Sequence, residues 1–223
     1  MAELQSTLFQ LAGGLRFTVG IFFLTLLFSI PLGLIVARGR MSKNKILAGV
    51  VRIYISVMRG TPLMLQLLLV YFGPYYVFGV KLADLDVGPF KYRFVATIIG
   101  FSLNYAAYFA EIFRGGIQSM PVGQYEAAQI LGFSRMQTFF RIILPQVIKR
   151  VLPSVTNEVI TLVKDTSLAQ VLAVTEMFTM AKNLASTQVS VMPFIAAGAF
   201  YYIMNGVIEI VMTRAEKSMS YYS

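Results

Sequence analysis

The sequence predicts an all-α, polytopic integral membrane protein that crosses the bilayer about five times. Its mean hydropathy is +0.70. Of its 223 residues, 57% are hydrophobic and 13% are charged, about half the share of roughly 25% that is usual in soluble domains. A helix needs roughly 20 apolar residues to cross the hydrocarbon core. Stretches of about this length without any charge are Phe17–Ala37, Gly60–Val80, Phe94–Ala110 and Asn183–Ile208.

We expect a single transmembrane domain of residues 1–223 whose spans lie at about 17–37, 50–78, 94–113, 142–163 and 191–211. The second span is interrupted at Gly60-Thr61-Pro62, because Pro62 has no amide hydrogen to donate and should kink or break a helix. The fourth span is less hydrophobic and carries Glu158. Residues 79–93 are expected to form a short exterior loop, and residues 166–190 an exterior or half-inserted element rather than a full span.

The net charge of +9 is concentrated in two segments. Residues 38–59 contain basic but no acidic side chains, and residues 114–150 contain Glu126 as their only acid. Because short basic loops face the cytoplasm, we expect a plasma (inner) membrane protein with its N-terminus outside and its C-terminus cytoplasmic. We expect no nucleic-acid partner, since no basic patch is interleaved with stacking aromatic residues.

The absence of both cysteine and histidine limits the chemistry of the chain. It excludes disulfides, thiolate nucleophiles, the commonest zinc ligand and a Ser-His-Asp triad. No Gly-x-x-x-x-Gly-Lys-[Ser/Thr] loop occurs, so no segment is built to hold nucleotide phosphates. The N-terminus does not resemble a cleaved signal, because Glu3 is acidic and no basic residue precedes Arg16. We therefore expect no enzymatic activity, metal or cofactor on this chain.

The most informative segment is the predicted cytoplasmic loop of residues 120–141. A short amphipathic helix should follow Pro121 and stop at Gly132, which can adopt the left-handed conformation at a helix end. A second helix should start at Ser134, a favourable N-cap. Glu126 lies in the first turn of the first helix, where a carboxylate suits the helix dipole. The next two residues, Ala127 and Ala128, offer little side-chain bulk, so another protein could approach the backbone closely.

This pattern of Glu-Ala-Ala, three residues, Gly and then an apolar run closing with Ile-Leu-Pro resembles the coupling loop of ABC importer permeases, the EAA-loop family of the type I importer fold. Other segments are similar to the polar amino-acid branch of these permeases: Arg59-Gly60-Thr61-Pro62, Ala110-Glu111-Ile112-Phe113-Arg114-Gly115-Gly116-Ile117, Leu144-Pro145-Gln146 and Lys164-Asp165-Thr166-Ser167-Leu168. The resemblance implies that Glu126, Ala127, Ala128 and Gly132 dock onto a groove of a cytoplasmic ATP-binding cassette ATPase.

The resemblance also implies the other components of the transport complex. ATP and Mg would bind to the partner ATPase, an exterior solute-binding protein would deliver the substrate, and a second permease copy would complete a homodimer. ATP-driven closure of the ATPases would move the loops and rock the helices in alternating access. ATP must then differ in its affinity for the two states.

Glu158 is the main substrate-binding candidate, since ionisable residues inside spans are costly and often functional. Thr161 and Asp165 follow it at i+3 and i+7 and share one helix face with it, together with Ser154. A carboxylate satisfied by a neighbouring helix or held protonated would also explain Glu158, and this alternative stays open. In the functional interpretation, Glu158 and Asp165 hold the side-chain cation of arginine or lysine.

The α-carboxylate of such a substrate would need hydrogen-bond donors. The broken backbone at Gly60–Pro62 and the amide of Asn104 are the candidates, and Asn157 and Met64 are weaker candidates for the wall of the site. Glu111 and Arg114 lie three residues apart on one helix face, and we expect them to form a structural or gating ion pair rather than to contact substrate.

Two other classes of membrane protein are considered. An ion-coupled secondary amino-acid carrier would need titratable relay residues and usually two pseudo-symmetric halves, and neither is evident. A channel or purely structural membrane subunit would bind no substrate. Co-purification with an ATPase and uptake by the isolated chain separate these alternatives.

Overall fold

The computed structural model describes residues 2–87 and 90–219, and nearly all of them are helical. The helices are α1 (Ala2–Arg40), α2 (Lys45–Gly60), α3 (Leu63–Phe78), α4 (Tyr92–Gln118), α5 (Val122–Ile130), α6 (Arg135–Gln137), α7 (Leu144–Asp165), α8 (Met177–Gln188) and α9 (Met192–Ser218). Three short segments of other helical types are η1 (Leu82–Leu85), η2 (Thr138–Ile143) and η3 (Thr166–Leu172). The described residues contain no strand, and Val87 and Phe90 form an isolated bridge. The all-α class is therefore confirmed.

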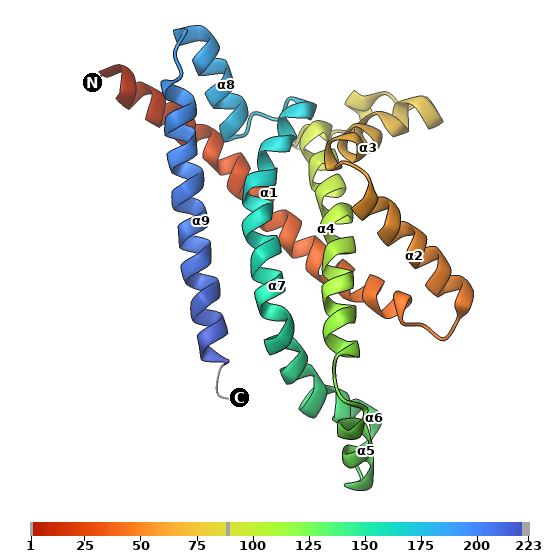
Figure 1. The fold of residues 1–223 in the computed structure, drawn as a ribbon. Coiled ribbons are helices and arrows are strands. Elements are labelled where there is room, and N and C mark those ends of the chain that lie inside the picture. The colour runs from red at the N-terminus through yellow and green to blue at the C-terminus, as the bar shows by residue number, and fades with distance from the viewer. Residues whose placement is uncertain (1, 88–89, 220–223) are drawn as a thin grey trace.

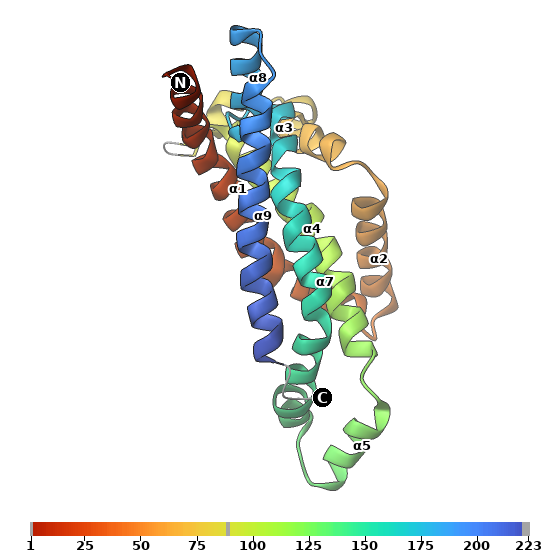
Figure 2. The same ribbon diagram turned by 60° about the vertical axis from the view of Figure 1, so that its left-hand side comes forward.

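Length and hydropathy identify three spanning helices in the described residues: α1, α4 and α9. The pair of α2 and α3 adds a fourth span if it is counted as one, although the two helices are bent by 113°. The prediction of about five spans also counted α7. This helix runs beside α4 in both views (Figures 1 and 2). It is not among the candidate spanning helices because its charged residues make it too polar.

The break between α2 and α3 lies where Pro62 predicts it. Pro62 becomes the N-cap of α3, and two buried amides take up the backbone oxygens at the break. Gln66 Nε2 donates to the carbonyl oxygens of Met58 at 2.9 Å and Thr61 at 3.1 Å. Asn104 Nδ2, on α4, donates to the same Met58 oxygen at 3.0 Å and to Gln66 Oε1 at 2.9 Å. This network compensates polar groups that lipid could not satisfy.

The core is built around α4, whose buried aromatic residues Phe101, Tyr105 and Phe109 are almost inaccessible to solvent. The oblique helix α1 crosses it closely at Gly33, where a Cβ atom would lie 2.8 Å from Cβ of Phe109. About two turns further along α4, a Cβ on Gly116 would collide with Val151 of α7. Small residues allow membrane helices to approach at such crossings.

The semi-polar residues 166–190 include η3, which packs mainly against α3, and α8, which packs against α1 and α9. Glu176 caps α8: its carboxylate accepts hydrogen bonds from the amides of Phe178 at 2.6 Å and Thr179 at 2.7 Å. It also accepts the hydroxyl of Tyr201 on α9 at 3.2 Å, and its side chain is fully buried. Glu176, which was not among the candidate residues predicted from the sequence, thus ties α8 to α9.

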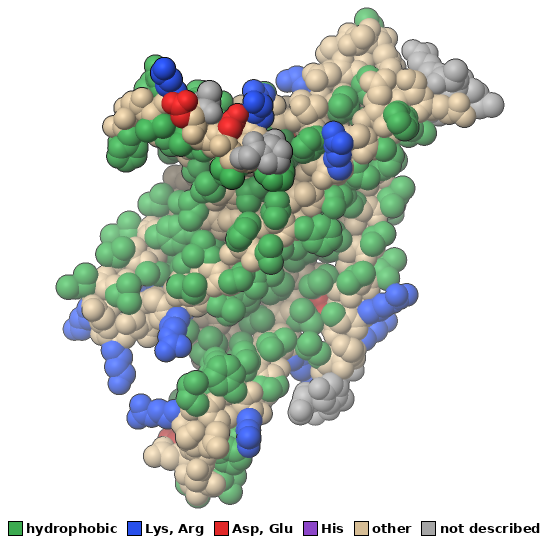
Figure 3. All heavy atoms as spheres, turned by 180° about the vertical axis from the view of Figure 1, so that it is seen from behind, with side chains coloured by type: hydrophobic (Ala, Val, Ile, Leu, Met, Phe, Trp, Pro, Cys, Tyr) green, Lys and Arg blue, Asp and Glu red, His purple; other side chains and the backbone are tan. Residues whose placement is uncertain are grey.

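The bundle has two distinct ends (Figures 1 and 2). Helices α5 and α6 project from one end, and α3, η1 and α8 lie at the other. Between them, a broad face of hydrophobic side chains is exposed, with lysine and arginine side chains concentrated towards the α5 end (Figure 3).

Candidate functional site

Local signals form the helical loop at the α5 end as predicted. Pro121 is the N-cap of α5, and the helix gives way to Gly132, whose φ of +80° places it in the left-handed region. The Ser134 side chain then accepts a hydrogen bond from the amide of Gln137, whose side chain bonds back to the Ser134 amide. This capping box starts α6.

The exposed face of α5 differs in one position from the predicted docking set. Glu126, Ala127 and Gly132 are exposed, but Ala128 is only 2% exposed and packs into this chain. The prediction of Ala128 as a docking contact is therefore corrected, because successive helix residues point about 100° apart. Two apolar side chains outside the predicted docking set project from the C-terminal end of α5 instead. Ile130 is 87% exposed and Leu131 is 73% exposed.

A surface pocket of about 540 Å³ lies where α5, α6 and η2 meet. Its lining residues are Tyr125, Gln129, Phe133, Ser134, Arg135, Thr138 and Phe139. An apolar group projecting from a polar loop, next to such a pocket, is typical of a protein interaction site.

One contact connects α5 to α7, and a second connects α7 to the C-cap of α4. The side-chain amides of Gln124 and Gln146 donate to each other at 2.9 and 2.8 Å. Arg150 Nη1 donates to the carbonyl oxygen of Ser119 at 2.9 Å and to its hydroxyl at 3.2 Å. Gln146 belongs to the Leu-Pro-Gln motif, so the motif anchors the loop to the base of α7.

Further along α7, the predicted polar stripe is present but not uniform. Glu158 and Asp165 are half-buried, whereas Asn157 and Thr161 are exposed. The Tyr105 hydroxyl of α4 donates to Asp165 Oδ2 at 2.7 Å, so this carboxylate is already engaged. The Thr161 hydroxyl donates to the backbone oxygen of Asn157 at 2.9 Å and can still accept a hydrogen bond.

No basic residue lies within one turn of Glu158 on α7, but the structure brings one from α2. Arg59 interacts electrostatically with Glu158, although the two form no ion pair in the part of the chain that the structure describes. The Arg59 guanidinium lies over the Tyr108 ring, 5.3 Å from its centroid, in cation–π geometry. Arg59 and Glu158 therefore place opposite charges near the break between α2 and α3.

Asn104 and Met64 lie at the same break. The Asn104 amide nitrogen is buried and donates to both Met58 and Gln66, which uses its two hydrogens. Its predicted role as donor to a substrate carboxylate is corrected accordingly: Asn104 positions the break. Met64 is exposed in the first turn of α3.

The predicted pair of Glu111 and Arg114 is present near the C-terminal end of α4. Arg114 donates through Nε to Oε1 at 3.0 Å and through Nη2 to Oε2 at 2.6 Å. Both side chains are about a quarter exposed. This bidentate geometry is the stronger form of an arginine–carboxylate pair.

The membrane-spanning helices and the projecting loop anchored to α7 are the features expected of the permease of an ATP-driven transporter. The chain belongs to the family of binding-protein-dependent transport system inner membrane components, whose profile matches residues 29–221. Membership in this family places ATP hydrolysis on a separate subunit and implies a substrate-binding partner. The resemblance inferred from the sequence is thus confirmed.

The chain is similar to several permeases over most of its length. It is 36% identical over 214 residues to the L-cystine transport system permease protein TcyB of Bacillus subtilis, covering 95% of this chain and 87% of that protein. It is 37% identical over 201 residues to the nopaline transport system permease protein NocM of Agrobacterium fabrum, covering 89% and 83%. A crystal structure of an amino acid ABC transporter with histidines matches with a TM-score of 0.82 and 32% identity, covering 94% of each chain.

Proposed function

We propose that this chain is the transmembrane subunit of an ATP-driven importer for polar, basic amino acids, with arginine and lysine as substrates. The observation that carries the proposal is the acidic face of α7. Glu158 is a half-buried carboxylate without an ion-pair partner in the described residues, and Asp165 lies two turns away on the same face. A basic side chain would supply a direct ion-pair partner. Similarity to permeases for cystine, nopaline and glutamine supports an amino-acid substrate.

Arg59 is proposed to make a second contact with the same substrate. Its guanidinium can receive an α-carboxylate in a planar, bidentate arrangement, while Glu158 holds the distal cation. Thr161, Asn157 and Met64, which are exposed near these charges, are proposed to line the site. The hydrogen bond from the Tyr105 hydroxyl fixes the position of the Asp165 carboxylate.

The assembly is proposed to be a homodimer of this chain with two ATPases and an exterior binding protein. The α5 end faces the cytoplasm, in agreement with its basic residues, and the N-terminus lies outside. In alternating access, the ATPases displace α5 through its exposed face, and the displacement reaches α7 through Gln124 and Gln146. Glu111 and Arg114 hold the neighbouring end of α4 as a structural or gating pair.

The test is uptake of radiolabelled arginine by the complete complex in proteoliposomes, with ATP enclosed. The proposal predicts ATP-dependent uptake that unlabelled lysine inhibits more strongly than glutamine does. Full uptake by the isolated chain without ATP would instead support an ion-coupled carrier or a channel.

A neutral zwitterionic amino acid is the second candidate, and the proximity of Arg59 to Glu158 favours it. In this case Arg59 holds the α-carboxylate and Glu158 the α-ammonium group, so no side-chain cation is needed. The substitution Arg59→Gln would then abolish uptake of glutamine and arginine equally. A basic-specific site predicts that glutamine is transported poorly by both the wild type and the variant.

A further inference from the structure

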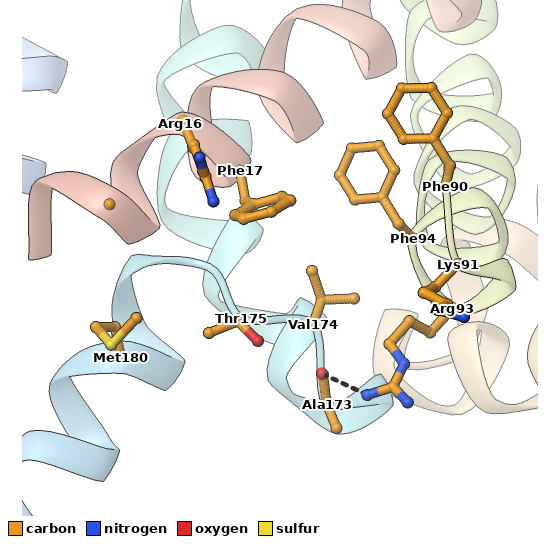
Figure 4. A pocket seen from close by; sticks show the side chains of 11 residues that line it. Arg16, Phe17, Phe90, Lys91, Arg93, Phe94, Ala173, Val174, Thr175 and Met180 are labelled. Atoms are coloured by element: carbon orange, nitrogen blue, oxygen red, sulfur yellow. Dashed lines mark hydrogen bonds between the residues drawn. The ribbon is translucent and has the colours of Figure 1, made fainter. Parts of the chain in front are cut away.

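A second candidate binding site lies at the end of the bundle opposite α5. A pocket of about 480 Å³ opens between α1, the start of α4 and the segment after η3. Figure 4 shows Arg16 and Arg93 on opposite sides of this pocket, with Phe17 beside Arg16 and Val174 between the two arginines in this view.

The charge of this pocket is positive. Arg16 lies over the Phe17 ring at 4.9 Å from the centroid, and Arg93 donates to the carbonyl oxygen of Ala173 at 3.2 Å. A third cation, Lys91, also lines the pocket and is paired with Asp86 at 3.1 Å. No carboxylate is among the described lining residues. The two arginines therefore favour an anionic ligand.

An apolar groove of about 570 Å³ continues from this pocket. It shares Phe90 and Phe94 with the pocket and extends along α1 and α4 as far as Leu103. At 1.5 Å per helical residue, the distance along α4 from Phe94 to Leu103 is roughly 14 Å. Apart from Ser102, its lining side chains are hydrophobic: Leu24, Phe28, Val95, Ile98, Ile99 and Leu103.

We infer that an anionic phospholipid occupies the pocket and the groove together. Its phosphate group lies between Arg16 and Arg93, and one acyl chain follows the groove towards the middle of the bundle. Basic side chains near a membrane surface attract anionic lipid head groups, and the adjoining groove has the composition that an acyl chain requires. An acidic protein segment or a free phosphate ion would use the pocket but leave the groove without an occupant. The bound lipid bridges α1 and α4.

The experiment measures the phospholipid retained by the purified permease after exchange into detergent containing equal amounts of phosphatidylglycerol and phosphatidylcholine. Native mass spectrometry counts the bound lipids. The wild type should retain phosphatidylglycerol preferentially. Either Arg16→Gln or Arg93→Gln should reduce this preference about fivefold, since each basic residue contributes about that factor. Arg16→Gln leaves the contact with Ala173 intact, and thermal unfolding checks that both variants are folded.

Two further variants complete the design. Ile99→Trp fills the groove and should lower the retention of phospholipid even though both arginines are present. Lys182→Gln removes an exposed cation of α8 outside both cavities and should change nothing. Equal retention of the two lipids by the wild type would overturn the inference. Displacement of the lipid by inorganic phosphate alone would also overturn it. So would folded arginine variants that retain as much lipid as the wild type but no longer capture the binding protein.

Discussion

Gln124 of α5 and Gln146 of α7 hold each other through two reciprocal amide hydrogen bonds, 2.9 and 2.8 Å long. Gln146 Nε2 also donates to the carbonyl oxygen of Ile142 in η2 at 2.7 Å, which fixes the position of the amide. Glu158 lies about three turns further along α7. The residues that anchor α5 and the acidic stripe therefore lie on the same helix, and we propose that a displacement of α5 reaches the stripe through it.

Removing this link should uncouple ATP hydrolysis from substrate. Each hydrogen bond contributes about 1 kcal/mol and either substitution removes both, so Gln124→Ala or Gln146→Ala should reduce substrate-stimulated ATP hydrolysis of the reconstituted complex about 30-fold. Because the two residues form one contact, the double variant should lose little more than either single variant. Gln10→Ala, on an exposed part of α1, is the control. Additive losses would show that the two amides act separately.

The two alanines of α5 should respond differently to the same enlargement. Ala127→Leu alters the exposed face and should weaken ATPase association more than about tenfold, or about 1.4 kcal/mol, with the thermal midpoint unchanged. Ala128→Leu overpacks a buried position and should destabilise the permease by about 1–3 kcal/mol. Association is measured by co-purification and stability by thermal unfolding. Equal effects on both readouts would refute the assignment of the two faces.

Asn104 should matter for stability because it holds the break between α2 and α3. Asn104→Leu leaves the oxygens of Met58 and Gln66 with fewer donors, and we expect a loss of about 1–3 kcal/mol. The thermal midpoint of the purified permease measures it, and Asn183→Leu at an exposed position of α8 is the matched control. A midpoint equal to that of the control would contradict this role.

Asp86 should make the loop between α3 and α4 sensitive to acid. The Tyr92 amide donates to Asp86 Oδ1 at 2.6 Å and Lys91 lies beside Oδ2, which holds the pKa of Asp86 below its ordinary value of 3.8. A depressed carboxylate pKa stabilises the fold above the unfolded-state pKa, and this contribution is lost as the pH falls through the folded-state value. The difference in thermal midpoint between the wild type and Asp86→Asn should therefore shrink on acidification. A constant difference would exclude this linkage.

Local signals predicted the α5–α6 loop and the break at Pro62 correctly. Pro121, Gly132 and Ser134 each determine the backbone within a few residues, so no tertiary information was needed. The number of spans was harder to predict. The charges of α7 lower its hydropathy, although α4 and α9 pack beside it.

Contacts between distant segments could not be predicted in the same way. Nothing in the sequence places Arg59 near Glu158, or Gln66 beside Asn104, because these contacts depend on how α2 and α3 fold back against α4 and α7. The inward orientation of Ala128 depends likewise on packing. Glu176 could have been recognised as a helix cap, but its burial depends on α9.

The most direct test of the account is arginine uptake by the ATP-driven complex carrying Glu158→Gln. If Glu158 holds the cationic side chain, removing its charge should lower arginine uptake at least about 30-fold, as expected for truncating one side of a buried charge pair. Thr161→Val should give a smaller loss, and ATPase association should be unchanged in both variants. Wild-type arginine uptake by Glu158→Gln would contradict the proposed substrate site.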